Sequence, residues 1–254
     1  MPDLHLVAVS LASLLAGLID AIVGGGGLVL TPALFAAYPA MPPATLLGTN
    51  KSASVWGTCM ASVQYSRRVQ LRWPVLLPAA AVALLGSLCG AWTVTQVEPD
   101  FLRRLLPLIL IAVLAYTLAR KDLGRIHAPR YTLRGEQLAG SLIGLGIGWY
   151  DGFFGPGTGS FFIFLFVRLL GYDFLNASAA AKLLNVATNV AAIALFAAKG
   201  HVWWQAGLVM AAANVAGSLM GTQLALRHGT GFVRGVFILV VGALIVKTGC
   251  DAFF

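Results

Sequence analysis

The segment DAIVGGGG, at residues 20–27, interrupts an apolar run with one aspartate and four consecutive glycines. A related segment, DGFFGPGTGS, occupies residues 151–160 and places its aspartate 131 positions later. The same offset, without any gap, relates further polar, aromatic and glycine positions: Gly17 to Gly148, Lys51 to Lys182, Trp73 to Trp204 and Gly86 to Gly217. Matches of Asp, Lys, Trp and Gly at one offset are hard to explain by an apolar composition alone. The sequence therefore predicts two homologous halves.

The two predicted halves cover residues 1–118 and 139–254, and a basic segment, 119–138, links them. Each half contains five apolar segments, which in the first half lie at about 4–22, 27–38, 45–65, 74–95 and 101–119. The second of these is only about 12 residues long, whereas an upright spanning helix takes about 20. We therefore expect it, and its counterpart at 158–168, to be re-entrant or to belong to a broken helix that lines a cavity.

The composition agrees with membrane-spanning helices. Of the 254 residues, 59% are hydrophobic and only 10% are charged, whereas an ordinary soluble domain carries about 25% charged residues. Such a chain cannot cover a globule of this size with charge, which excludes a soluble enzyme, a disordered protein and a nucleic-acid-binding protein. The net charge of +8 is therefore interpreted as a signal of orientation in the lipid bilayer. The predicted fold class is an all-α polytopic membrane protein.

The basic residues of the linker predict how the protein is oriented in the membrane. Residues 120–134 contain five basic residues and one acidic residue, so the positive-inside rule predicts that this linker is cytoplasmic. The basic loop at 67–72 lies two predicted crossings earlier and should be on the same side. In the second half, more basic residues lie inside if that half is inverted relative to the first. Inverted repeats with broken helices are typical of secondary transporters.

Four charged residues lie inside the apolar segments. Asp20 and Lys51 are the only charged residues in the segment 6–66, and Asp151 and Lys182 occupy the matched positions in the second half. A charge at the centre of a bilayer costs at least about 2.5–3.5 kcal/mol, so their recurrence indicates that something compensates them. They could form structural Asp–Lys pairs, or the lysines could face a central cavity and attract an anion. The two interpretations are compatible if the aspartates hold the loops.

Polar groups near the lysines and the Gly-rich loops define the candidate substrate site. Glycine allows backbone amides to approach a ligand, and the N-terminus of the helix that follows attracts anions. The candidate substrate-binding residues are Lys51, Lys182, Asn50, Asn185, Asn189, Gly25, Gly26, Gly157 and Gly159. Asp20 and Asp151 are assigned to loop geometry or to proton coupling. The same amides could instead hydrogen-bond between helices, an alternative that the sequence leaves open.

The sequence gives no support for enzymatic or metal chemistry. Ser160 is the best candidate for an intramembrane nucleophile, but no histidine lies in the middle of an apolar segment to activate it. There is no HExxH motif, no CxxC motif and no pair of histidines at metal-ligand spacing. We therefore expect neither an enzyme nor a bound metal or cofactor.

The two halves together resemble a known family of membrane proteins. The resemblance rests on four stretches: GLIDAIVGGGGLVLTPAL at 17–34, GTNKSASVWGT at 48–58, GWYDGFFGPGTGSFF at 148–162 and AAAKLLNVATNVAAIALF at 179–196. With these motifs, and over residues 4–250, the chain is similar to the sulfite exporter TauE/SafE family, in particular its YfcA-like branch. This resemblance implies a multi-pass protein of the cell inner membrane that moves small anionic sulfur compounds such as sulfite or sulfonates.

The sequence as a whole predicts a secondary transporter that moves a small anion by alternating access between the two repeats. The expected partners are this anion and the lipid bilayer, without nucleic acid, and a homodimer is compatible with the sequence. A passive anion channel could be built from the same residues. A membrane scaffold without transport activity is a third alternative.

Overall fold

The computed structural model describes residues 4–96, 111 and 124–253, and every regular element in these ranges is a helix. The helices are α1 (Leu4–Val23), α2 (Gly27–Ala37), α3 (Pro43–Ser66), α4 (Trp73–Val94), α6 (Leu133–Phe153), α7 (Thr158–Leu165) with its π-helical extension η1 (Phe166–Leu170), α8 (Phe174–Ala198) and α9 (Trp204–Phe253). The first four agree within two residues with the predicted segments. The predicted segment at 101–119 and the first part of the basic linker lie outside the described residues, apart from Ile111.

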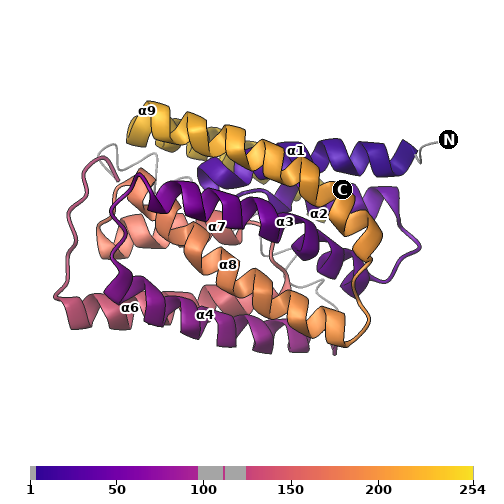
Figure 1. Cartoon of the computed structure of the whole chain (residues 1–254), viewed down its shortest axis with the longest axis horizontal. Coiled ribbons are helices and arrows are strands. Elements are labelled where there is room, and N and C mark those ends of the chain that lie inside the picture. Colours follow the sequence, from indigo (N-terminus) through magenta and orange to yellow (C-terminus); the bar gives the residue numbers. More distant parts are fainter. Residues whose placement is uncertain (1–3, 97–110, 112–123, 254) are drawn as a thin grey trace.

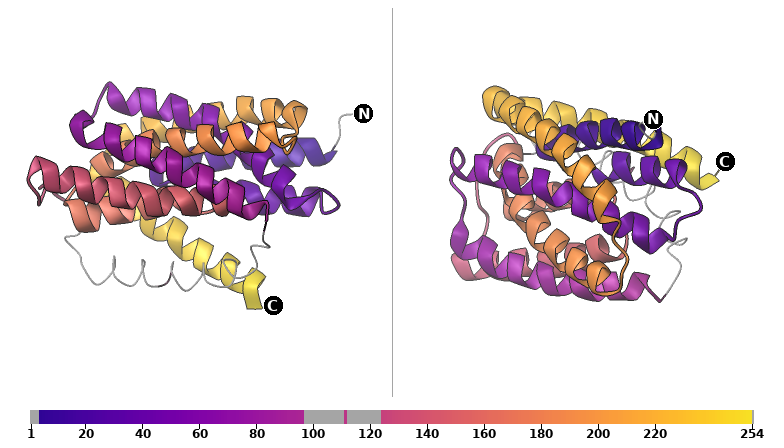
Figure 2. Two further views of the ribbon diagram at one scale, coloured as in Figure 1. Left: turned by 90° about the horizontal axis from the view of Figure 1, so that it is seen from below. Right: turned by 45° about the vertical axis from the view of Figure 1, so that its right-hand side comes forward.

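The long helices form an elongated bundle (Figures 1 and 2). In the described part of the chain, four helical stretches are long and apolar enough to cross a membrane: α1, α4, α8 and residues 204–243 of α9. These stretches expose large apolar side chains, among them Leu11, Leu77, Leu85, Val190, Leu208 and Leu239. Buried polar residues lie in the interior of the bundle. Helices that expose large apolar side chains and bury polar residues in the interior fit a protein surrounded by lipid and confirm the predicted fold class.

The two short helices follow breaks at the Gly-rich loops, as the sequence predicts. Helix α2 has 11 residues, which at 1.5 Å per residue gives roughly 16 Å, about half the thickness of a bilayer core. Gly24, just after α1, has a φ of 78°, and Gly155, at the matched position after α6, has a φ of 87°. Side chains with a Cβ rarely adopt this left-handed conformation, so glycine ends both long helices here.

Side chains from other helices donate hydrogen bonds to the last three backbone carbonyls of α1. The Tyr65 hydroxyl donates to the carbonyl of Ala21 at 2.9 Å. Ser178 donates to the carbonyl of Ile22 at 3.1 Å, and Ser160 donates to that of Val23 at 2.9 Å. Backbone groups at membrane depth must find partners within the protein, and these three hydroxyls supply them.

The helix starts recur at the predicted offset of 131. Helices α2, α3 and α4 begin at Gly27, Pro43 and Trp73, and their counterparts begin 131 residues later, at Thr158, Phe174 and Trp204. Helix α1 packs against α9, its counterpart α6 packs against α4, and α3 packs against α8. In Figure 1, α1 and α9 lie along one side of the bundle, α4 and α6 along the other, and α3 and α8 between them.

Individual contacts also recur when the two halves are exchanged. Gly217 of α9 packs against the carbonyl of Leu14 in α1, and the matched Gly86 of α4 packs against that of Leu145 in α6. Two buried hydrogen bonds repeat in the same way: Ser218 donates to the Gly57 carbonyl at 2.5 Å, and Ser87 to the Thr188 carbonyl at 2.7 Å. Gly86 and Gly90 form one GxxxG motif, and Gly217 and Gly221 form the other; all four glycines lie against backbone carbonyls of the neighbouring helix. These motifs therefore serve close helix packing, which is related by exchange of the halves.

Helix α9 is interrupted at Gly229, whose φ of 73° and ψ of −166° are not helical. The stretch before Gly229 corresponds by the offset to α4. The stretch after it corresponds to the predicted segment at 101–119. The long helix is therefore two consecutive helices of the second half.

Candidate functional site

The two Gly-rich loops meet in the centre of the bundle. A Cβ atom built on Gly24 would lie 2.3 Å from the carbonyl carbon of Gly159, and one built on Gly159 would lie 2.4 Å from the Cα of Gly24. Only glycine at both positions allows this backbone contact between the halves.

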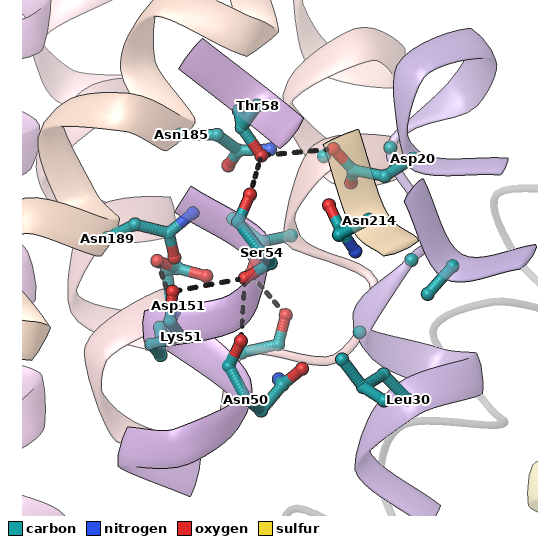
Figure 3. Close-up of a pocket in the computed structure, with 17 residues that line it drawn as sticks. Asp20, Leu30, Asn50, Lys51, Ser54, Thr58, Asp151, Asn185, Asn189 and Asn214 are labelled. Atoms are coloured by element: carbon teal, nitrogen blue, oxygen red, sulfur yellow. Dashed lines mark hydrogen bonds and ion pairs between the residues drawn. The ribbon is translucent and has the colours of Figure 1, made fainter. Parts of the chain in front are cut away.

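A small polar cavity lies beside this crossing and is shown in Figure 3. Its volume is about 40 Å³, enough for about three water molecules at roughly 10–15 Å³ each. Its polar and glycine lining comes from both halves: Asp20, Gly24, Gly26, Gly27, Asn50, Lys51, Ser54, Thr58, Asp151, Gly155, Thr158, Gly159, Asn185, Asn189 and Asn214. Ala16 and Leu30 complete the wall. The cavity can therefore hold a compact polar solute.

The four charged residues that the sequence placed inside the apolar segments form two ion pairs, and each pair joins the two halves. Lys51 Nζ lies 2.5 Å from Asp151 Oδ2, with both side chains 5% exposed. Lys182 Nζ lies 3.0 Å from Asp20 Oδ2, with side chains 0% and 16% exposed. Each lysine thus neutralises the aspartate of the other half. The structural Asp–Lys pairing that the sequence left open is present, and it crosses between the repeats.

The two lysines differ in their position relative to the cavity. Lys51 lines it, whereas Lys182 is fully buried behind Asp20 and is not part of the lining. Asp20 also accepts a hydrogen bond from the Thr58 hydroxyl at 3.4 Å. The expected pair of lysines facing one site is thus reduced to a single lysine in the cavity wall.

The facing helices α3 and α8 contribute polar side chains at matched positions. Asn185 and Asn189 of α8 correspond by the offset to Ser54 and Thr58 of α3, and all four line the cavity. The sequence analysis singled out the two asparagines but not the two hydroxyl residues. Subtracting the offset of 131 from Asn185 and Asn189 would have identified Ser54 and Thr58 as candidates.

Asn214 of α9 is a cavity residue that the sequence did not indicate. Its Nδ2 donates to the carbonyl of Ser13 in α1 at 3.0 Å. Its counterpart by the offset is Ala83, so it makes the site asymmetric. A single asparagine in an apolar helix is equally typical of a hydrogen bond between helices, and Asn214 forms such a bond. The sequence therefore carried no signal that distinguished a cavity residue from a helix-packing residue.

The predicted glycines divide between the cavity and its support. Gly26 and Gly159 line the cavity, whereas Gly25 and Gly157 do not. Gly157 has a φ of 85° and precedes the first residue of α7. Helices α2 and α7 both begin at the cavity wall, with Gly27 and Thr158 in its lining. The N-termini of these half-helices carry partial positive charge, which favours an anion in the cavity.

Two amide oxygens in the wall have no partner within the protein. Asn50 Oδ1 and Asn185 Oδ1 are buried and make no hydrogen bond, whereas Asn50 Nδ2 donates to Thr31 Oγ1 at 3.1 Å. Buried polar atoms are nearly always hydrogen-bonded. These two oxygens therefore indicate that the cavity receives a group able to donate hydrogen bonds.

A further buried carboxylate, Glu136, lies away from the cavity, at the start of α6. Glu136 is fully buried, with Oε2 2.8 Å from Arg72 Nη1 and Oε1 2.5 Å from the Tyr172 hydroxyl. Burial and this hydrogen bond raise the pKa of Tyr172. The sequence analysis assigned Glu136 to the linker and missed this contact between the halves.

Comparison with known proteins agrees with the membrane architecture. The profile of the family described as "Sulfite exporter TauE/SafE" matches residues 9–248. The "Probable membrane transporter protein ORF9" of Sinorhizobium sp is 36% identical over 99% of this chain and 96% of its own length. The "Probable membrane transporter protein YfcA" of Escherichia coli K12 is 37% identical over 94% of this chain and 88% of its own. No solved structure matches this chain.

A third relative, the "Probable membrane transporter protein" of Haemophilus influenzae, is 35% identical over 93% of this chain and 91% of its own length. The family and these relatives are named as membrane transporters or exporters rather than enzymes. This outcome agrees with the expected absence of an enzymatic role. The profile match and the similarity over nearly the whole chain show that this protein belongs to the sulfite exporter TauE/SafE family of membrane transporters.

Proposed function

We propose that the protein is a secondary transporter that carries a small anion, a sulfur oxyanion or a small organosulfonate, across the cell inner membrane. The observation that carries this proposal is the cavity between the repeats, with Lys51 in its wall and the N-termini of α2 and α7 beside it. An ammonium group and helix N-termini are the groups that recognise oxyanions. The family to which the chain belongs supports the sulfur chemistry.

The size of the cavity favours the smaller members of this class. A volume of about 40 Å³ suits an ion with few heavy atoms, such as sulfite. The amides of Asn185 and Asn189 line it and can donate to oxyanion oxygens. The hydroxyls of Ser54 and Thr58 also line it but donate to the carbonyls of Asn50 and Ser54. A larger sulfonate would require the helices around the cavity to move apart.

We also propose that the halves 1–118 and 139–254 are inverted repeats and that transport proceeds by rocking of one against the other. The contacts that recur on exchange of the halves support this arrangement. The start of α4 lies beside the start of α6, where Gln137 donates to the Pro74 carbonyl, and the end of α8 lies beside the end of α4, where Lys199 donates to Thr95. In Figure 1 the connections 67–72 and 124–132 are at one end of the bundle, and 199–203 is at the other. We propose that the first end, with the basic linker, is cytoplasmic.

The test is anion flux in proteoliposomes containing the purified protein. Sulfite, sulfate, thiosulfate and methanesulfonate are supplied in turn, and we expect saturable uptake and counterflow of at least one of them. Conductance that rises linearly with concentration, without counterflow, would favour an anion channel. Absence of flux for all four anions would contradict the proposal and leave the scaffold interpretation.

A matched pair of lysine variants tests the site itself. Lys51→Ala should abolish saturable flux, because it removes the ammonium group from the cavity wall. Lys199→Ala is the control: this lysine is exposed and donates to Thr95 outside the cavity, so its loss should leave flux unchanged. Equal flux in both variants would show that Lys51 does not bind the anion.

A further inference from the structure

We propose that anion binding is coupled to protonation of Asp151, so that one proton travels with each monovalent anion. This inference rests on the proposed function, since it assigns the coupling ion of the same site. Lys51 leaves Asp151 to bind the anion, and a hydronium ion gives its proton to Asp151 Oδ2. One O–H bond of the hydronium breaks, one forms on the carboxylate, and a water molecule is left.

The first support for proton coupling is that the four charged residues at the site have no net charge. Asp20, Lys51, Asp151 and Lys182 sum to zero, and they pair within the interior of the bundle. A monovalent anion added to this site would leave one uncompensated negative charge in a poorly hydrated interior, which is strongly unfavourable. A proton taken up at the same time restores neutrality.

The geometry of the Lys51–Asp151 pair shows which group must take up the proton when an anion binds. The ammonium that would bind the anion already lies 2.5 Å from Asp151 Oδ2. Figure 3 shows this contact in the cavity wall, with Asn50 and Asn189 drawn around the same space. If Lys51 turns to the anion, an ionised Asp151 loses its countercharge while 95% buried. A protonated Asp151 is neutral and becomes a hydrogen-bond donor.

The unpartnered amide oxygens fit the protonated form. Asn50 Oδ1 and Asn185 Oδ1 belong to residues that are 7% and 6% exposed, and both residues line the cavity with Asp151. An ionised carboxylate has no hydrogen to offer them, whereas a protonated carboxyl group or a water bound beside it does. The cavity wall thus holds hydrogen-bond acceptors that an anion, itself an acceptor, would leave without a donor.

The matched pair, Asp20 with Lys182, is not suited to the same role. Lys182 is fully buried and outside the cavity lining, so an anion in the cavity cannot replace Asp20 as its partner. Asp20 also retains the Thr58 hydroxyl as a donor. We assign the Asp20–Lys182 pair to holding α8 against α1. Of the two homologous ion pairs, Asp20–Lys182 is therefore structural and Lys51–Asp151 is the coupling pair.

Other titratable groups near Asp151 do not offer an alternative proton site. Among the described residues that line the cavity, the titratable ones are Asp20, Lys51 and Asp151. From α8 the nearest charge is Lys182, already paired. From α6, the Tyr150 hydroxyl donates its hydrogen to the carbonyl of Pro156 at 2.5 Å. Asp151 is therefore the carboxylate whose countercharge the anion would remove.

The experiment compares wild type with Asp151→Asn, which mimics the protonated carboxyl group. Proteoliposomes are loaded with sulfite at a pH low enough that it is present as the monovalent hydrogen sulfite. Two rates are measured with labelled hydrogen sulfite: exchange at equal pH, and net accumulation driven by an imposed difference of one pH unit. In the wild type we expect both, with accumulation of about tenfold for one proton per anion. In Asp151→Asn we expect gradient-driven accumulation to fall to the level of protein-free liposomes, a larger loss than that of the exchange rate measured in the same variant. Because sulfite has the same protonation in both samples, the difference reports on Asp151 alone.

The outcomes separate this inference from the proposed function. Sulfite exchange in the wild type without a response to the pH gradient would overturn proton coupling and leave the transporter intact. Gradient-driven accumulation that persists in Asp151→Asn would overturn the assignment to Asp151. No exchange in the wild type would overturn sulfite transport, and the coupling with it. Lys199→Ala serves as the control that should retain both rates.

Discussion

Lys51 of the first half and Asp151 of the second form an ion pair that closes one wall of the central cavity. The same pair with the halves exchanged, Lys182 with Asp20, is present but is more deeply buried on the lysine side. The sequence allowed either structural Asp–Lys pairs or lysines facing an anion site, and the structure connects the two halves through both pairs. A movement of one half against the other must change the environment of both pairs.

The Lys182–Asp20 pair should be essential for stability. Lys182→Ala leaves Asp20 without its buried countercharge, and breaking a buried pair on one side costs about 3–5 kcal/mol. The purified variant should unfold at a clearly lower temperature in detergent, measured by loss of the monodisperse size-exclusion peak after heating. The double variant Asp20→Asn with Lys182→Met removes both charges and should recover most of the loss. A single variant as stable as wild type would argue against a structural role for the pair.

The contact between the two Gly-rich loops should tolerate no side chain. Gly159→Ala would bring a Cβ within 2.4 Å of the Gly24 Cα. Neither backbone segment can move away without separating the two halves. We expect a several-fold loss of folded protein in the membrane, measured with a C-terminal fluorescent fusion. Gly146→Ala is the matched control because a Cβ there meets nothing within 4 Å. It should be neutral, or stabilising by up to about 1 kcal/mol through helix propensity. Equal expression of both variants would be incompatible with the loop crossing.

Two asparagines of the cavity should behave differently when truncated. Asn185 lines the cavity, where its Nδ2 can donate to the anion, so Asn185→Ala should weaken substrate binding and raise KM. Because its Oδ1 makes no hydrogen bond within the protein, thermal stability should stay close to that of the wild type. Asn214 Nδ2 donates to the Ser13 carbonyl, so Asn214→Ala should in addition cost about 0.5–1.5 kcal/mol of stability. Flux kinetics and thermal unfolding of both variants provide the check. A large stability loss in Asn185→Ala with unchanged KM would assign it to packing instead.

The sequence predicted most of the fold because its signals were local or repeated. The offset of 131 aligned the helix starts, and the runs at residues 24–27 and 155–159 located the breaks. The cavity was found only in part. Lys51 could be identified as a buried charge, but its partner was not predictable, since pairing across the halves depends on how the helices pack. The counterpart of Asn214 in the first half is Ala83, so no repeated polar residue marked its position.

The buried Glu136 should stabilise the contact between the start of α6 and the segment before α4. Arg72→Ala removes its countercharge, while Tyr172→Phe removes only one hydrogen bond donor. We therefore expect Arg72→Ala to lower the unfolding temperature more than Tyr172→Phe, with the latter costing about 1–3 kcal/mol for the unsatisfied buried acceptor. Arg68→Ala is the control, since this arginine is exposed in the same loop. The reverse order of the two variants would show that the ion pair is not important for folding.

Single cysteines at the two ends of the bundle should report the orientation of the protein. In a background without Cys59, Cys89 and Cys250, we expect Ile126→Cys in the linker to react with a membrane-impermeant maleimide only after the cells are opened. Lys199→Cys lies at the opposite end and should react in intact cells. Both positions are exposed, so burial does not protect either thiol. Labelling of both cysteines from the same side would contradict the bundle as a membrane-spanning unit. Labelling of the linker alone in intact cells would reverse its orientation, because the basic end would then face outward.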